Sequence, residues 1–192
     1  MAFWINLFNV MVIHGVIELG IRDSVREVPR FFRRICYLIG GLEFSADDIE
    51  HGILRGNHRF PHSLLHPFGQ QDPRRSQLIE PMDPRIHFAL VCASSSCPPI
   101  EIYSAETLDE DLEVSGKTFL NSGGVRIDCE TCTIWLPKVF DWYGEDFGRT
   151  EEERLLFIAP YLYRNEDRQY LVQNAGRFRV KYDPYDWRLN RT

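Results

Sequence analysis

A cysteine in a serine-rich loop is the residue in this sequence best suited to nucleophilic chemistry. The segment DPRIHFALVCASSSCPPI, residues 83–100, contains Cys97 directly before two prolines. Small Ala and Ser residues leave room for a ligand, and the prolines hold the following backbone extended. A thiol held in one direction is a nucleophile when a base or a positive field lies within hydrogen-bond reach. We therefore predict Cys97 as a nucleophile, with Ser95 and Ser96 as binding residues.

Three histidines are the candidate bases for this thiol: His14, His51 and His87. His14 lies one helical turn before Glu18, whose carboxylate could orient the imidazole ring. His51 directly follows Glu50, and these two residues form a second candidate acid–base pair. Sequence spacing does not show which of the three histidines approaches the thiol.

Structural roles are the alternative explanation for these polar residues. Asn6 and Asn9 lie side by side on a predicted helix that is apolar on its remaining faces, so they must bond loop groups or line a cleft. Both are candidate binding residues, as is Asp186, whose segment could close a cleft or lock onto the core. A packed Cys97 fits this alternative too, because free cysteines are commonly buried.

Two further groupings have the residue types of redox or metal sites in an unsuitable context. Cys129 and Cys132 flank the expected turn of a β-hairpin, whereas a redox CxxC motif normally opens a helix. His58, His62 and His66 recur at intervals of four, but a proline before His62 interrupts a shared helical face. We therefore predict no metal site and no cofactor.

The composition is that of an ordinary folded domain. The chain has 192 residues, 44% of them hydrophobic, and a net charge of −6. An acidic chain lacks the field that a phosphate backbone requires, so we expect no nucleic acid and instead an unidentified small-molecule or protein partner. The apolar start has no basic region and no cleavage site, which indicates a core helix and no membrane association. Five irregularly spaced cysteines without a signal peptide favour the cytoplasm.

The order of predicted elements indicates an α+β fold. Helices and strands alternate irregularly, which disfavours a doubly wound sheet. We expect a mixed sheet with two β-hairpins packed against several helices, in a single domain over residues 1–192. The predicted elements are a helix at 2–19, a hairpin of ICYLI and LEF, a helix opened by Ser45, a buried strand RIHFALVC, a helix from Ser104 to about Leu120, a hairpin of VRID and TIWL, helices in FDWYGEDF and EEERLLFIAPYL, and a closing strand FRVKY.

Five sequence blocks in order resemble one protein family. The blocks are AFWINLFNVMVIH, GGLEFSADDIEHGILRG, DPRIHFALVCASSSCPPI, LPKVFDWYGEDFG and YDPYDWRLN. They are similar to the bacterial branch of the domain of unknown function 547 family, and the resemblance covers essentially the whole chain. It implies no assigned activity, although related domains fused to glutaredoxin-like or DEP modules imply redox or signalling contexts. It also implies that residues of the domain precede Met1.

Two functions are compatible with these patterns. In the first, the chain is a Cys-dependent hydrolase or an acyl- or thiol-transfer enzyme, in which Cys97 attacks an acyl carbon or a disulfide sulfur and a histidine takes the proton. In the second, it is a non-catalytic binding or protein-interaction module with a structural cysteine loop. Cys97 and a histidine in one cleft would favour the enzyme, and a sealed Cys97 would favour the module.

Overall fold

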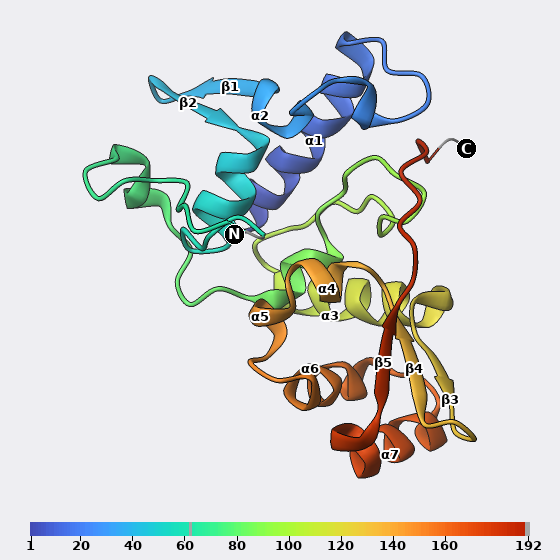
Figure 1. Ribbon diagram of the computed structural model, residues 1–192. Coiled ribbons are helices and arrows are strands. Elements are labelled where there is room, and N and C mark those ends of the chain that lie inside the picture. Colours follow the sequence, from blue (N-terminus) through green and yellow to red (C-terminus); the bar gives the residue numbers. More distant parts are fainter. Residues whose placement is uncertain (62, 191–192) are drawn as a thin grey trace. The chain divides into compact units, whose positions relative to one another are not determined.

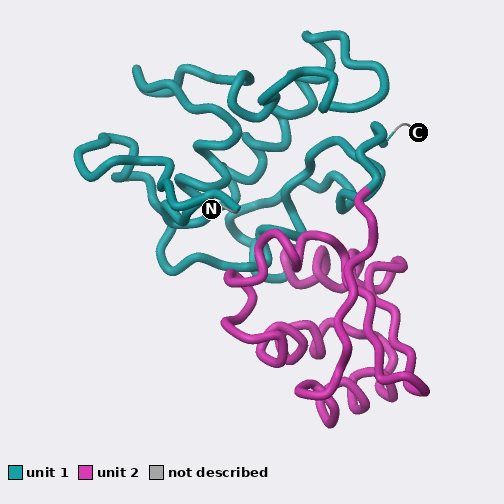
Figure 2. The backbone as a smooth tube through the Cα atoms, viewed as in Figure 1, with its two compact units in different colours: residues 1–111, 186–192 teal, residues 112–185 magenta. Residues whose placement is uncertain are grey.

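The chain opens with helix α1, Ala2–Glu18, in a computed structural model that describes residues 1–61 and 63–190. Backbone contacts divide the chain into two compact units (Figure 2). Unit 1 comprises residues 1–111 and 186–192, and unit 2 comprises residues 112–185. The chain contains helices and two small sheets, so the predicted α+β class is confirmed. The expectation of one domain over the whole chain stays a prediction.

The first hairpin of unit 1 has the predicted position and turn. Strands β1, Cys36–Ile39, and β2, Leu42–Ser45, pair antiparallel and form a two-stranded sheet of their own (Figure 1). Both residues of the Gly40–Gly41 turn have positive φ angles, which glycine adopts without steric cost. Preceding these strands are the short helices η1, Val25–Glu27, and α2, Phe31–Arg34.

The helix that follows Ser45 is a π-helix, η2, spanning Asp48–Leu54. The Ser45 hydroxyl and the Asp48 carboxylate accept each other's backbone N–H groups, as the predicted capping box requires. Gly52 packs against the ring of Phe68, where an added Cβ would lie only 2.3 Å from a ring carbon. Short π-helices are rare and recur at functional sites.

The predicted strand RIHFALVC is wrong. Residues Pro84–Phe88 form a 3₁₀ helix, η4, followed by an irregular loop. The Asp83 side chain accepts the backbone N–H of Arg85, and Pro84 occupies the first helical position. These are the signals of a helix start, and they outweigh an apolar run that fits either a buried strand or a buried helix.

Unit 2 contains the second hairpin and most of the later helices. Its sheet has the order β3-β4-β5, in which β3 pairs antiparallel with β4 and β4 pairs parallel with β5. The hairpin and the closing strand are therefore confirmed. The strands are β3, Arg126–Asp128, β4, Thr133–Leu136, and β5, Arg179–Tyr182; the helices are α3, Leu108–Phe119, which begins in unit 1, then η5, Leu120–Gly124, α4, Val139–Trp142, α5, Gly144–Phe147, α6, Glu151–Ile158, η6, Ala159–Tyr161, α7, Asn165–Asn174, and η7, Ala175–Arg177.

The surface excursion between the π-helix and η4 carries one more helix, η3, Pro73–Gln77. Arg74 anchors it, since its guanidinium lies over the buried ring of Phe68 and pairs with Asp48 and Asp72. In the part of the chain that the structure describes, no helix is long and apolar enough to cross a membrane.

Candidate thiol site

Helix α1 fixes the polypeptide that leads into the cysteine loop. The Asn9 side chain is 3% exposed; its amide donates to the Ala89 carbonyl at 3.0 Å, and its oxygen accepts the Val91 N–H at 3.0 Å. A paired amide of this kind satisfies two buried backbone groups at once. Asn9, predicted as a binding residue, is therefore bonded to the backbone one residue before Cys92.

Asn6 fixes the polypeptide that leaves the loop. Its amide donates to the Tyr103 carbonyl at 2.7 Å, and its oxygen accepts the Tyr103 N–H at 3.0 Å. The two asparagines are side by side on one helix, as the sequence predicts, and they hold chain segments on both sides of residues 92–97. These contacts favour the structural explanation of both asparagines.

Two cysteine sulfurs meet within this loop. The Cys92 and Cys97 sulfurs are 2.6 Å apart, and both thiols are half-buried. The Cys97 N–H donates to the Ser94 carbonyl at 3.0 Å and closes a tight turn. The Cys92 N–H donates to the Cys97 sulfur at 2.9 Å. The contact places a backbone donor against the Cys97 sulfur.

Ser94 is a site residue that the sequence analysis missed. It is 0% exposed, and its hydroxyl oxygen lies 3.2 Å from the Cys92 sulfur and 3.4 Å from the Cys97 sulfur. One hydroxyl carries one proton and can donate to one sulfur at a time. The Ser94 hydroxyl can therefore donate to whichever of the two sulfurs carries a negative charge.

A distant segment, residues 186–190, runs along the outer edge of this loop. Ser94 and Leu189 form an antiparallel bridge. The Ser95 N–H donates to the Arg188 carbonyl at 2.8 Å, and the Asn190 N–H donates to the Ala93 carbonyl at 3.0 Å. On the other side of the segment, the Leu189 N–H donates to the carbonyl of Asp23.

Ser95, Ser96 and Asp186, which were predicted as binding residues, contact this segment or belong to it. The Ser95 hydroxyl donates to the Arg188 carbonyl, and the Ser96 hydroxyl oxygen accepts the Asp186 N–H at 2.9 Å. The Arg188 guanidinium, which donates to both carboxylate oxygens, lowers the pKa of Asp186 to about 2. The three residues therefore hold segment 186–190 against the cysteine loop.

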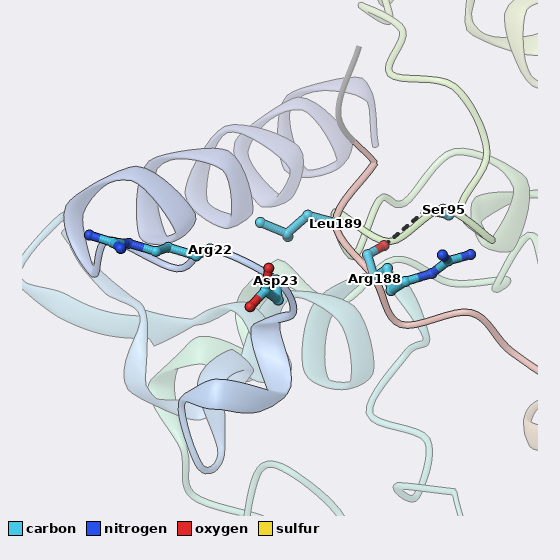
Figure 3. Close-up of a pocket in the computed structure, with 5 residues that line it drawn as sticks. All are labelled: Arg22, Asp23, Ser95, Arg188 and Leu189. Carbon is cyan, nitrogen blue, oxygen red and sulfur yellow. Dashed lines mark hydrogen bonds between the residues drawn. The ribbon is translucent and has the colours of Figure 1, made fainter.

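A cavity of about 460 Å³ lies beside the bridge (Figure 3). Figure 3 shows the Leu189 side chain on the Asp23 side of its backbone, away from Ser95, and the two arginine side chains pointing away from each other. The two arginine side chains therefore do not converge on one point in the cavity. Its lining residues are Arg22, Asp23, Ser95, Arg188 and Leu189.

The three candidate histidines occupy different local environments. His14 is exposed; its Nδ1 lies 2.6 Å from the Tyr37 hydroxyl, and its Nε2 lies 3.6 Å from Glu18. The Glu18 contact is the one that helical spacing predicts. His87 is buried within η4. The choice of a histidine base for Cys97 stays a prediction.

His51 is a buried ring that contacts an arginine. Its Nδ1 lies 3.0 Å from the Arg55 guanidinium and 3.9 Å from the Glu50 carboxylate. Because the guanidinium only donates, Nδ1 accepts and the ring proton belongs on Nε2. The nearby Asp47 carboxyl has a pKa raised to about 6, mainly by burial and then by Glu50, although Arg33 opposes the shift.

The remaining cysteine and histidine groupings have structural contacts. Cys129 is exposed in the β3–β4 turn, and its carbonyl accepts the Tyr170 hydroxyl. The His66 ring bonds the Asn57 carbonyl at 2.7 Å. His62 lies outside the described residues. Residues 1–61 and 63–190 contain no cluster of three or more metal-ligating side chains.

Comparison with known families assigns this chain to one of them. Residues 1–120 match the family model "Protein of unknown function, DUF547". The match covers more than half of the 192 residues, so the chain belongs to this family. No curated protein and no solved structure matches the chain. The matched residues include the whole Cys92–Cys97 loop, whereas segment 186–190 lies outside the match.

Proposed function

We propose that this protein is a thiol-transfer enzyme that exchanges thiols with disulfides, with Cys97 as nucleophile and Cys92 as resolving thiol. The observation that carries the proposal is the contact between the two sulfurs, 2.6 Å apart in one short loop. A second thiol within reach of the first resolves a mixed disulfide without a water nucleophile. The buried Ser94 hydroxyl and the Cys92 N–H provide donors for a negatively charged sulfur.

The reaction begins with attack on the substrate disulfide. The Cys97 thiolate attacks one sulfur of the disulfide, a Cys97–substrate bond forms, and the other half leaves as a thiol after taking a proton. The Cys92 thiolate then attacks the Cys97 sulfur, and the second half of the substrate leaves in the same way. The substrate disulfide is reduced to two thiols, and the enzyme is oxidised to a Cys92–Cys97 disulfide. Two molecules of a low-molecular-weight thiol, of the kind that a reducing cytoplasm maintains, then reduce the enzyme disulfide and leave as their own disulfide.

Disulfide exchange fits the loop better than acyl hydrolysis. An acyl enzyme needs a histidine to activate the nucleophile and then a water molecule. His14 and His51 bond Tyr37 and Arg55 through their Nδ1 atoms. The contacts of Cys97, in contrast, include a second thiol, a buried hydroxyl and a backbone N–H, the groups that exchange requires.

Trapping of the mixed disulfide tests the proposal. The native chain and a Cys92→Ser variant are incubated with a small aromatic disulfide, and each cysteine is mapped by mass spectrometry. We expect Cys92→Ser to accumulate a mixed disulfide at Cys97, because the resolving thiol is missing. The native chain should instead form a Cys92–Cys97 disulfide and release two aromatic thiols.

The matched control is Cys132→Ser, which removes a half-buried thiol from the β3–β4 turn and should behave as the native chain does. If Cys97 reacts only after unfolding, or no faster than Cys36 and Cys129, the proposed chemistry is wrong. That result would favour a binding module with a structural cysteine loop.

A further inference from the structure

The bridge between the cysteine loop and segment 186–190 has the hydrogen bonds of a strand pair. The Ser95 N–H donates to Arg188, and the Asn190 N–H donates to Ala93, one bond on each side of the Ser94–Leu189 pair. In this type of antiparallel pair, the two Cα atoms are about 4.5 Å apart and the two side chains lie on the same face. The Leu189 side chain therefore lies on the face of the loop toward which Ser94 points.

The face that Leu189 shares with Ser94 is the face of the thiols. The Ser94 hydroxyl contacts both cysteine sulfurs at 3.2 and 3.4 Å. Leu189 also lines the cavity beside the loop, which has room for a larger side chain (Figure 3). In a regular antiparallel pair, a residue at this position would share a face with Ser94, whose hydroxyl contacts both sulfurs.

We propose that the edge formed by Ala93, Ser94 and Ser95 binds an extended polypeptide that carries a disulfide, and that residues 186–190 occupy this edge as an internal stand-in. The inference rests on the proposed function and names its substrate class. Recognition uses main-chain hydrogen bonds, as in other cases where a peptide adds to an exposed edge. The substrate cysteine takes the place of Leu189.

The side chains of the segment support a detachable occupant. Leu189 is half-buried, and Arg188 pairs with Asp186 of the same segment. The Trp187 ring lies under the Arg26 guanidinium, 5.4 Å from the ring centre. Three main-chain donors, at Ser95, Leu189 and Asn190, and the hydroxyls of Ser95 and Ser96 also attach the segment.

A cysteine scan along the segment tests the register. Leu189→Cys, Arg188→Cys and Asn190→Cys are made in a chain in which Cys97 is the remaining native cysteine and the other four are serine. Each chain is treated with a small aromatic disulfide, which is reduced to two thiols as the protein disulfide forms. We expect a cross-link to Cys97 at least ~10-fold faster from position 189 than from 188 or 190, because strand neighbours face opposite ways. Equal rates at all three positions would overturn the proposed register.

A peptide added to the full chain tests the substrate class. Asn190→Pro removes the N–H that bonds Ala93, whereas the matched Asn190→Ala keeps it. The probe is a fluorescent peptide PYDWRLN without a thiol, so that binding is measured apart from chemistry. We expect about fivefold tighter binding to Asn190→Pro than to Asn190→Ala, the effect of about one main-chain hydrogen bond. If Asn190→Pro unfolds, Trp187→Ala releases the segment through the loss of its contact with Arg26.

The reactive form of this peptide has cysteine in place of leucine, activated as a mixed disulfide, and is added to Cys92→Ser chains with and without Asn190→Pro. Coupling to Cys97 should increase about fivefold with the proline, and N-methylation of the peptide after its cysteine should abolish the gain. The small aromatic disulfide should couple equally to both chains. Equal rates of peptide coupling in the two chains would overturn the proposal that this edge binds a polypeptide. A Cys97 that couples to neither reagent would refute the proposed function, and the thiol-free peptide would still report on the edge.

Discussion

The two cysteine pairs of this protein differ in what surrounds them. Cys129 and Cys132 have the spacing of a redox motif, yet they lie in an exposed hairpin turn shaped by Asp128, whose carboxylate accepts the N–H groups of the next residues. Cys92 and Cys97 have no familiar spacing, yet their sulfurs meet. The comparison teaches that thiol chemistry depends on how the backbone is held around the sulfur. Spacing is a weaker guide.

Removing a nucleophile should separate the pairs most strongly. We expect Cys97→Ser to lower the rate of disulfide exchange at least ~100-fold, because it removes the attacking sulfur, while Cys132→Ser stays within about twofold of the native rate. Steady-state reduction of a small aromatic disulfide measures both variants. A comparable loss in the two variants would end the distinction between the pairs.

The Asn9→Ala substitution, which loosens the polypeptide before Cys92, should affect the Cys92–Cys97 pair and leave the Cys129–Cys132 pair unchanged. Asn9→Ala leaves the Ala89 carbonyl and the Val91 N–H without their partner in a buried setting, so we expect the free energy of unfolding to fall by about 2–3 kcal/mol. Urea denaturation measures this loss.

The same variant should alter cysteine reactivity under native conditions. Iodoacetamide labelling of Cys92 and Cys97 should change, while labelling of Cys129 stays constant. Asn174→Ala is the matched control, because Asn174 bonds a single carbonyl within α7. A uniform change at every cysteine would indicate global loosening and contradict a local clamp.

The free energy of unfolding should depend on pH through Asp47 in unit 1. Burial and Glu50 raise the pKa of Asp47 to about 6, so the folded state holds this proton more tightly than the unfolded state. Stability from this group is complete below the ordinary value near 4 and is lost as pH rises through 6. We expect the free energy of unfolding to fall by about 1–2 kcal/mol over that interval in the native chain, and less in Asp47→Asn. Chemical denaturation at pH 4, 5, 6 and 7 measures the slope, and identical slopes would contradict the assignment.

The smallest expected effect concerns the hairpin turn. Asp128→Ala removes the carboxylate that bonds the backbone of Glu130 and Thr131. We expect labelling of Cys132 to become about twofold faster, since a surface turn that loses local hydrogen bonds frays modestly. Cys97 should label at the native rate, and a change there would show that the two cysteine pairs communicate.

Local patterns predicted much of the fold. Helix α1, both hairpins and the Ser45–Asp48 capping box all depend on residues close together in the sequence. The predicted strand before Cys92 is wrong because its apolar residues suit any buried element, while the Asp83–Pro84 helix start carried the deciding information. The residues before Cys92 are buried because other parts of the protein pack over them, which a local pattern does not show.

The candidate site was predicted in part for the same reason. Cys97 stands out by its prolines, whereas nothing local distinguishes Ser94 from the two serines that follow it. Ser94 is the fully buried one, and its backbone partner Leu189 lies far along the chain. Long-range pairing of irregular segments leaves no periodic signal in a sequence.

The pairing of Ser94 with Leu189 also bears on how the protein is made. The two residues are separated by nearly half of the chain, and such contacts form after local helices and hairpins because a long loop must close first. During synthesis, the Ser95 N–H therefore cannot bond its native acceptor until Arg188 has left the ribosome. Until then the loop that carries Cys92 and Cys97 lacks the main-chain hydrogen bonds of this edge.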